Sequence, residues 1–201
     1  MAGTHGRFEF RCWARDLSEV ERSIRQNSEP SGTEDSEEIY VVAPGCDGSN
    51  VKLREGTIDI KVLVATRDGL EQWQPRSKHG LPVKAETIAQ EVLPALGVTA
   101  ALEMPEYARE GLLEQVVQPH QDLKAVPVTK QRRFFTVNGC MTELADVVID
   151  GEVFQTAALE AEKPEVVIET KRRLGLDKFE NVSYVRAVKH VIGMKRCAAM
   201  P

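Results

Sequence analysis

The sequence predicts an α+β fold with a largely antiparallel sheet. Strand-like segments lie on both sides of a central region, about residues 83–121, whose apolar side chains have helical spacing. The separation of strands from helices along a chain is typical of α+β domains, and two-residue turn signals between strand-like runs favour antiparallel neighbours. We therefore expect a single domain over residues 1–201, with a helical insert at about 83–121.

The individual elements follow from local patterns. Residues 7–13 alternate between polar and apolar side chains as in a strand, and the apolar residues Leu17, Val20 and Ile24 then have helical spacing. Residues 27–36 are polar and contain Pro and Gly, which predicts a mobile loop. The remaining expected elements are strands over 38–42, 50–54 and 57–64, three further strands between 126 and 162, and helices over 164–174 and 183–192.

The composition excludes several classes of function. Acidic residues outnumber basic ones, 31 to 26, so the net charge is −5, whereas general binders of nucleic acid or anionic membranes carry the opposite sign. No apolar run approaches the roughly 20 residues of a membrane-spanning helix. The first residues also lack the apolar core of a secretory signal. We therefore expect a cytoplasmic protein that binds neither nucleic acid nor membranes.

The cysteines and histidines show no metal-binding pattern. No two of the four cysteines form a Cys-x-x-Cys pair, which argues against a zinc site or a disulfide framework and is typical of reduced thiols. The four histidines likewise lack the spacing of metal ligands. A metal ion in this protein would therefore be a hard cation held by carboxylates.

Two-residue turns indicate which side chains share a face of the sheet. Three turn signals, Glu55-Gly56, Asn138-Gly139 and Asp150-Gly151, lie between strand-like runs, and Asn-Gly and Asp-Gly suit a type I′ turn, in which both central residues have positive φ. If each loop has two residues, directly paired residues point to one face. The predicted charged faces are Lys130, Arg132, Glu143, Glu160 and Glu162 on a three-stranded meander, Lys52, Arg54, Asp59 and Lys61 on the first hairpin, and Arg7, Glu9 and Arg11 on the opening strand.

Charges at every second position have two interpretations. A single such face is most simply a solvated outer surface. Here, however, both signs recur in one small sheet, and Glu160 and Glu162 place like charges where a cation would relieve their repulsion. If the sheet curls with these faces inward, Lys and Arg side chains would hold the oxygens of a polyphosphate while carboxylates hold Mg²⁺.

The order of these charged strands resembles a known family, the CYTH superfamily of triphosphate tunnel metalloenzymes. The family includes class IV adenylate cyclases, thiamine triphosphatases and inorganic triphosphatases. The residues that carry the likeness are Glu9-Phe10-Arg11, Lys52-Leu53-Arg54, Lys61, Lys130-x-Arg132, Glu143, Glu160-x-Glu162 and Asn181-Val-Ser183-Tyr184. The likeness covers about residues 7–192, and the segments FEFRCW, EEIYVV, VKLREG and EQWQP look closest to a bacterial CYTH-like subgroup.

The resemblance implies a fold and a set of ligands. The fold would be an antiparallel eight-stranded β-barrel with an open tunnel and flanking helices, whereas the sequence itself indicates about seven strands. A triphosphate would be held by Arg11, Lys52, Arg54, Lys61, Lys130 and Arg132. Mg²⁺ or Mn²⁺ would be held by Glu9, Glu143, Glu160 and Glu162. The catalytic roles would fall to Glu160, Glu162 and Arg11.

The opening strand departs from the family pattern. The family has a glutamate where this chain has Arg7, and a lysine where it has Arg11. The first change weakens a metal site built from carboxylates, and a guanidinium cannot transfer a proton as a buried lysine can.

The leading interpretation is a metal-dependent phosphohydrolase that acts on a triphosphate-containing substrate. The alternatives are a non-catalytic module that binds polyphosphate or a phosphorylated metabolite, and a class IV-like adenylate cyclase. The helical insert also offers a surface for a homodimer.

Five other residues are expected to be structural. Trp73 is expected to anchor a connecting segment to the barrel wall rather than to cap the tunnel or stack on a ligand base, and Tyr184 would pack the last helix onto the barrel. Cys140 has no recognisable base near it and is expected to be a small strand residue rather than a nucleophile. Lys189 and His190 are expected at the surface.

Overall fold

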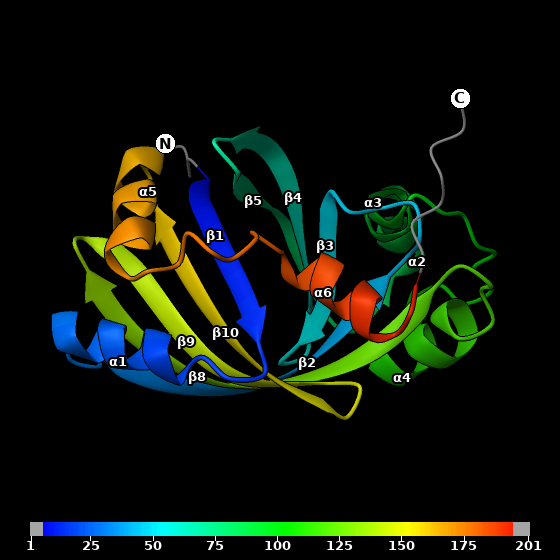
Figure 1. Ribbon diagram of the computed structural model, residues 1–201. Coiled ribbons are helices and arrows are strands. Elements are labelled where there is room, and N and C mark those ends of the chain that lie inside the picture. Colours follow the sequence, from blue (N-terminus) through cyan, green and yellow to red (C-terminus); the bar gives the residue numbers. More distant parts are fainter. Residues whose placement is uncertain (1–5, 195–201) are drawn as a thin grey trace. The chain divides into compact units, whose positions relative to one another are not determined.

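The computed structural model describes residues 6–194 (Figure 1). The strands are β1 (Arg7–Ala14), β2 (Gly32–Val42), β3 (Ser49–Arg54), β4 (Thr57–Arg67), β5 (Leu70–Gly80), β6 (Val83–Lys84), β7 (Glu106–Tyr107), β8 (Lys124–Val137), β9 (Cys140–Ile149) and β10 (Glu152–Ala161). The helices are α1 (Ser18–Asn27), α2 (Ala85–Thr87), α3 (Leu93–Leu96), α4 (Arg109–Leu112), α5 (Pro164–Arg173) and α6 (Tyr184–Val191), with π-helical turns η1 (Ile88–Val92) and η2 (Leu113–Val117). Both His5 and Cys197 lie outside the described residues.

Eight of the strands form a closed barrel. Their hydrogen-bonded order is β1-β10-β9-β8-β2-β3-β4-β5, and β6 pairs with β7 in a separate two-stranded sheet. The expected antiparallel eight-stranded barrel with flanking helices is therefore confirmed. Along residues 6–194 no helix is long and apolar enough to cross a bilayer.

The chain divides into two compact units, each of which is described by itself. The first unit comprises Met1–Ser36, Leu63–Gln74 and Thr129–Ser183, and the second comprises Glu37–Val62, Pro75–Val128 and Tyr184–Pro201. Strands β2, β4, β5 and β8 each contribute residues to both units.

The core of the first unit lies between α1, α5 and one face of the sheet (Figure 1). On β1, Phe10 and Cys12 point into this core, so alternation places Glu9 and Arg11 on the opposite face. The expected helical spacing is confirmed in α1, where Val20 and Ile24 are buried. Full burial of a side chain such as Ile24 stabilises the fold by about 2 kcal/mol. This packing decides which face of the strands carries the charged residues.

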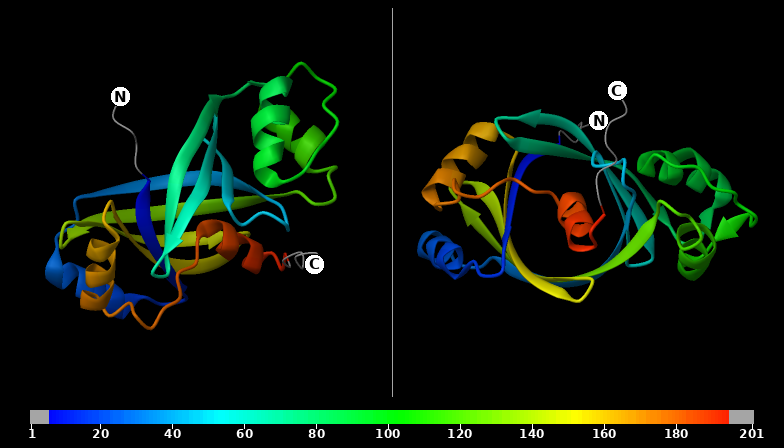
Figure 2. Two further views of the ribbon diagram at one scale, coloured as in Figure 1. Left: turned by 90° about the horizontal axis from the view of Figure 1, so that it is seen from above. Right: turned by 45° about the vertical axis from the view of Figure 1, so that its right-hand side comes forward.

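The second unit has its own core, to which the helical insert contributes. Apolar residues of β3 and β4 pack against residues of α2, α3, α4 and the π-helical turns η1 and η2. Figure 2 shows the helices of the insert in green. Helix α6 lies against β3, and the ring of Tyr184 stacks on Tyr40 with centroids 5.7 Å apart, as expected for a residue that packs this helix onto the barrel. Lys189 is not at the surface as predicted: it is 4% exposed, because its ammonium group is 2.7 Å from Asp47.

The turn predictions are confirmed. Both central residues have positive φ at Glu55-Gly56 (49° and 72°), at Asn138-Gly139 (52° and 70°) and at Asp150-Gly151 (49° and 83°). A fourth turn of this kind, Asp68-Gly69, joins β4 to β5. The predicted register of β9 and β10 also holds, since Glu143 pairs with Ala158 and Met141 with Glu160.

Two predictions about local structure are wrong. Residues 32–36, expected in a mobile loop, form the start of β2; the backbone N–H of Ser31 beside them already donates to the carbonyl oxygen of Phe134, at 2.7 Å. Trp73 does not anchor a connecting segment, because it lies within β5, opposite Arg7 of β1. Neither segment has the apolar alternation of a half-buried strand, so pairing with distant strands decides its conformation.

Candidate functional site

Charged side chains gather on the face of the first unit that lies opposite its core. We call these residues the first charged face. Strand pairing brings them together: Glu9 on β1 lies directly opposite Glu160 on β10 and Glu71 on β5. The first charged face comprises Arg7, Glu9, Arg11, Glu71, Trp73, Lys130, Arg132, Glu143 and Glu160.

Arg11 bridges two carboxylates on this face. Its Nε donates to Oε1 of Glu9 and its Nη1 to Oε1 of Glu143, both at 2.9 Å. Nη1 also lies 3.4 Å from the hydroxyl of Thr156. The side chain of Arg11 is only 5% exposed, compared with 21% for Glu9 and 14% for Glu143. A charged bridge that is this well buried is held in one geometry by its hydrogen bonds.

The backbone of Arg11 is fixed by the loop that follows α5. Its N–H donates to Oδ1 of Asn181 at 2.8 Å, and its carbonyl oxygen accepts from the N–H of Val182 at 2.8 Å. The side-chain nitrogen Nδ2 of Asn181 in turn donates to the backbone carbonyl oxygens of Glu9, at 3.2 Å, and Gly69, at 2.9 Å. Asn181 thus ties the loop to β1 at the level of the bridge.

The electrostatics of Glu143 agree with this bridge. Burial alone would raise the pKa of its carboxyl group, but the positive charge and hydrogen bond of Arg11, with the charges of Lys130 and Arg132, bring the pKa below its ordinary value. Lys130 is 4% exposed, and Arg132 is paired with Glu34 at 2.6 Å. Glu143 therefore stays ionised among three cations.

Two residues of this face were missed by the sequence analysis. Glu71 extends the row of carboxylates formed by Glu160 and Glu9, and the indole N–H of Trp73 donates to Oε2 of Glu71 at 3.0 Å. The alternation of Glu71 and Trp73 was visible in the sequence, but only the pairing of β5 with β1 assigns them to this face.

The carboxylates do not form the expected metal site. Glu162 lies in the bend after β10 and is exposed, while Glu9 and Glu143 are already bridged by the guanidinium of Arg11. Within residues 6–194 no group of three or more Asp, Glu, His or Cys side chains is arranged to hold a metal ion. The residues present therefore do not fit the Mg²⁺ or Mn²⁺ that the family resemblance implied.

The second unit has a separate basic cluster around one buried carboxylate. Oε1 of Glu38 lies 3.0 Å from Nζ of Lys52 and 3.7 Å from Nη1 of Arg54. The side chain of Glu38 is 0% exposed, and those of Lys52 and Arg54 are 14% and 22% exposed. We call Glu38, Lys52, Arg54 and Lys61 the second charged cluster.

The second charged cluster is rich in positive charge. Burial lowers the pKa of Lys52 below its ordinary value; Glu38 opposes this shift, whereas the nearby charges of Lys61 and Arg54 add to it. Asp59, on the same hairpin, lies 3.5 Å from Lys78. Glu38 was not predicted as a site residue. Its spacing of two positions from Tyr40 in the EEIYVV segment indicated only that both side chains lie on one face of the strand.

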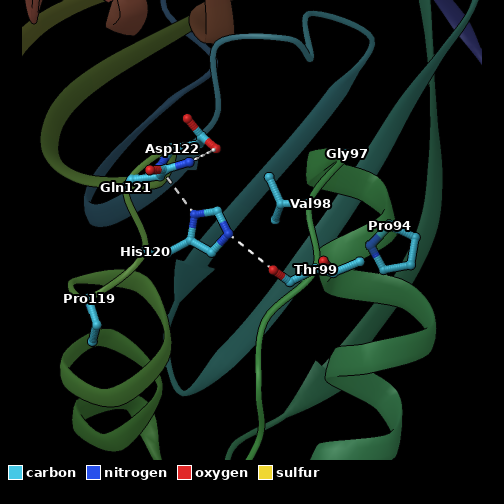
Figure 3. Close-up of a pocket in the computed structure, with 8 residues that line it drawn as sticks. All are labelled: Pro94, Gly97, Val98, Thr99, Pro119, His120, Gln121 and Asp122. Carbon is cyan, nitrogen blue, oxygen red and sulfur yellow. Dashed lines mark hydrogen bonds between the residues drawn. The ribbon is translucent and has the colours of Figure 1, made fainter.

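A cavity of about 800 Å³ lies in the helical insert, and no predicted site residue lines it (Figure 3). The imidazole ring of His120 lines this cavity. Its Nε2 lies 3.1 Å from the carbonyl oxygen of Thr99, and its Nδ1 accepts a hydrogen bond from the backbone N–H of Asp122 at 3.1 Å. These partners fix the neutral tautomer with hydrogen on Nε2. The imidazole thus has a structural part in joining two loops of the insert.

Comparison with known proteins supports the fold. No family model and no curated protein matches the sequence. The structure of PH1012 from Pyrococcus horikoshii OT3 matches with a TM-score of 0.53 and 19% identity, over 89% of this chain and 97% of that chain. The structure of HpAC1 from Hippeastrum, a proposed adenylyl cyclase with a dominant triphosphatase activity, matches with a TM-score of 0.51 and 11% identity, over 92% and 96% of the two chains. At these identities the likeness concerns the fold, and it agrees with a CYTH-like barrel.

Proposed function

We propose that this protein binds a triphosphate-containing small molecule or an inorganic polyphosphate through basic side chains of its barrel strands. The residues that would contact the phosphate oxygens are Lys52, Arg54, Lys61, Lys130 and Arg132. Arginine and lysine are the usual partners of phosphate groups, arginine through two parallel hydrogen bonds and lysine as a point charge.

One observation carries the proposal: Lys52 and Arg54 both lie beside the buried carboxylate of Glu38, and Lys61 lies close enough to lower the pKa of Lys52 further. Holding cations such as Lys52 and Arg54 together at partly buried positions is costly unless negative charge offsets it. A bound polyanion would supply this charge. It would stabilise the protonated form of Lys52 and reduce the repulsion within the second charged cluster.

Calorimetry with inorganic triphosphate tests the proposal. We expect Lys52→Gln and Arg132→Gln each to weaken binding at least about tenfold, which corresponds to about 1.4 kcal/mol. Lys84→Gln is the matched control, because Lys84 is an exposed residue of β6 in the second unit. Thermal melting of each variant separates a loss of binding from a loss of folding. Equal affinities for wild type, Lys52→Gln and Arg132→Gln would contradict the proposal.

Hydrolysis of the bound triphosphate is a second candidate. It is favoured by the likeness in fold to the Hippeastrum protein, which has triphosphatase activity, and by the position of Glu160 directly opposite Glu9. The assay is phosphate release from triphosphate, ATP and thiamine triphosphate, with and without Mg²⁺ or Mn²⁺, together with detection of cyclic AMP. Release that is lost in Glu160→Gln would establish hydrolysis, and cyclic AMP would establish the cyclase. Binding without either product would leave a binding module.

We also propose that the chain forms one domain. The helical insert would provide the surface of a homodimer. Light scattering of the purified chain tests the dimer. A dimer that is disrupted by charged substitutions on the exposed surface of the insert would support it, and a monomer at all concentrations would contradict it.

A further inference from the structure

We infer that Arg11 supplies the positive charge that a divalent cation was expected to supply between Glu9 and Glu143, so that this chain binds its polyphosphate as the metal-free anion. The inference rests on the proposed polyphosphate binding. It concerns the first charged face, which carries three of the carboxylates that the family resemblance assigned to the metal, Glu9, Glu143 and Glu160.

The geometry of three adjacent strands allows the bridge. Arg11 of β1 lies directly opposite Ala158 of β10, and Ala158 lies directly opposite Glu143 of β9. The middle position of this row carries only a methyl group, so the guanidinium can extend over it and reach the carboxylate two strands away. A large side chain at position 158 would stand between the two charges.

The guanidinium of Arg11 is permanently charged, and it binds one oxygen of each of the two carboxylates. Nε and Nη1 of Arg11 donate to Glu9 and Glu143, respectively, at 2.9 Å. A guanidinium does not lose its proton within the stable pH range of proteins. A divalent cation could coordinate these oxygens only by displacing a guanidinium that is 5% exposed, and it would then face that positive charge at close range.

Metal-free binding follows from the charges. Mg²⁺ forms complexes with triphosphate in solution and thereby reduces the negative charge that basic side chains recognise. Glu9 and Glu143 already share the positive charge of Arg11, so they offer the ion little additional attraction. Mg²⁺ should therefore weaken the binding of triphosphate rather than strengthen it.

Titration with Mn²⁺ alone, followed by electron paramagnetic resonance of the free ion, tests the role of Arg11 without any phosphate ligand. We expect no uptake by the wild type and uptake of about one Mn²⁺ per chain by Arg11→Gln, because this variant releases two neighbouring carboxylates. The double variant Arg11→Gln/Glu143→Gln should lose the gained uptake. Arg25→Gln is the matched control, since Arg25 pairs with Glu21 on the surface of α1 in the same unit.

Calorimetry with triphosphate, in EDTA and in excess Mg²⁺, tests the consequence on the unaltered protein, so the proposal stays testable even if Arg11→Gln does not fold. We expect affinity at least about tenfold higher in EDTA. Mn²⁺ uptake by the wild type that is lost in Glu143→Gln, failure of a folded Arg11→Gln to gain uptake, or tighter binding in Mg²⁺ would each overturn the inference. Absence of triphosphate binding in both conditions would instead refute the proposed function, while the Mn²⁺ titration would still report on Arg11.

Discussion

Nη1 of Arg11 lies 2.9 Å from Oε1 of Glu143, although 132 positions separate them in the chain and strand β10 lies between their strands. The contact shows that Arg11 does not belong to a solvated outer face, although Arg7 on the same strand is exposed. Arg11 is 4% exposed, as is Lys130. The charged residues of the first unit therefore form an ordered network whose members neutralise one another.

The first prediction concerns the acid stability of the protein. The pKa of Glu143 is lowered in the folded protein from an ordinary value of 4.5, so its stabilising effect is present above that value and is lost as the pH falls through the lowered pKa. Glu143→Gln should reduce the free energy of unfolding by about 2 kcal/mol at neutral pH, and the difference from wild type should shrink below pH 4.5. Urea unfolding at several pH values measures this. Glu165→Gln, an exposed carboxylate of α5, is the control, and a difference that is independent of pH would contradict the assignment.

The second prediction concerns proton uptake. Burial lowers the pKa of Lys52 below 10.5, and a bound polyanion should raise it again by stabilising the ammonium form. Triphosphate binding should therefore take up protons at alkaline pH, where part of Lys52 has lost its proton in the free protein. Calorimetry in buffers of different ionisation enthalpy detects the uptake. Lys52→Arg keeps the charge but does not titrate, so uptake that persists in this variant would assign the proton to another group.

The third prediction concerns the thiols. Burial raises the pKa of both Cys12 and Cys140 to about 11, and both side chains are 0% exposed. Neither should react with iodoacetamide in the native protein at about pH 8, because the reactive thiolate is scarce and shielded. Peptide mapping by mass spectrometry measures the modification, with the half-buried Cys46 as the internal comparison. Rapid native-state labelling of Cys140 would revive its interpretation as a nucleophile.

The fourth prediction concerns the turn between β3 and β4. Glu55 has a φ of 49°, a conformation that asparagine adopts more readily than glutamate. Glu55→Asn should therefore stabilise the protein by roughly 0.5 kcal/mol. The reciprocal change Asn138→Glu, at a turn with a φ of 52°, should destabilise it by a similar amount. Thermal unfolding of the two variants checks both signs, and a shift in the same direction for both would contradict the argument.

Local turn chemistry made much of the fold predictable from the sequence. Asn138-Gly139 and Asp150-Gly151 favour two-residue turns with positive φ, and the second of these turns sets the register of β9 and β10. The pairing of Glu143 with Ala158 follows from this register alone. The faces of these strands were therefore predictable, because each hairpin connects residues that are close in the chain.

The tertiary structure alone decided the eighth strand and the partners of the charged residues. Strand β5 has no strong apolar alternation, and its place beside β1 comes from pairing between segments more than sixty residues apart, as with Gly6 and Gln72, which lie 66 positions apart. The same kind of pairing brings Glu143 to Arg11 and leaves Glu162 in a bend outside β10. The sequence by itself determined which residues carry charge on each strand face. Which charges neutralise one another depends on the order of strands that are distant in the chain, and this order is set by the packing of the whole sheet.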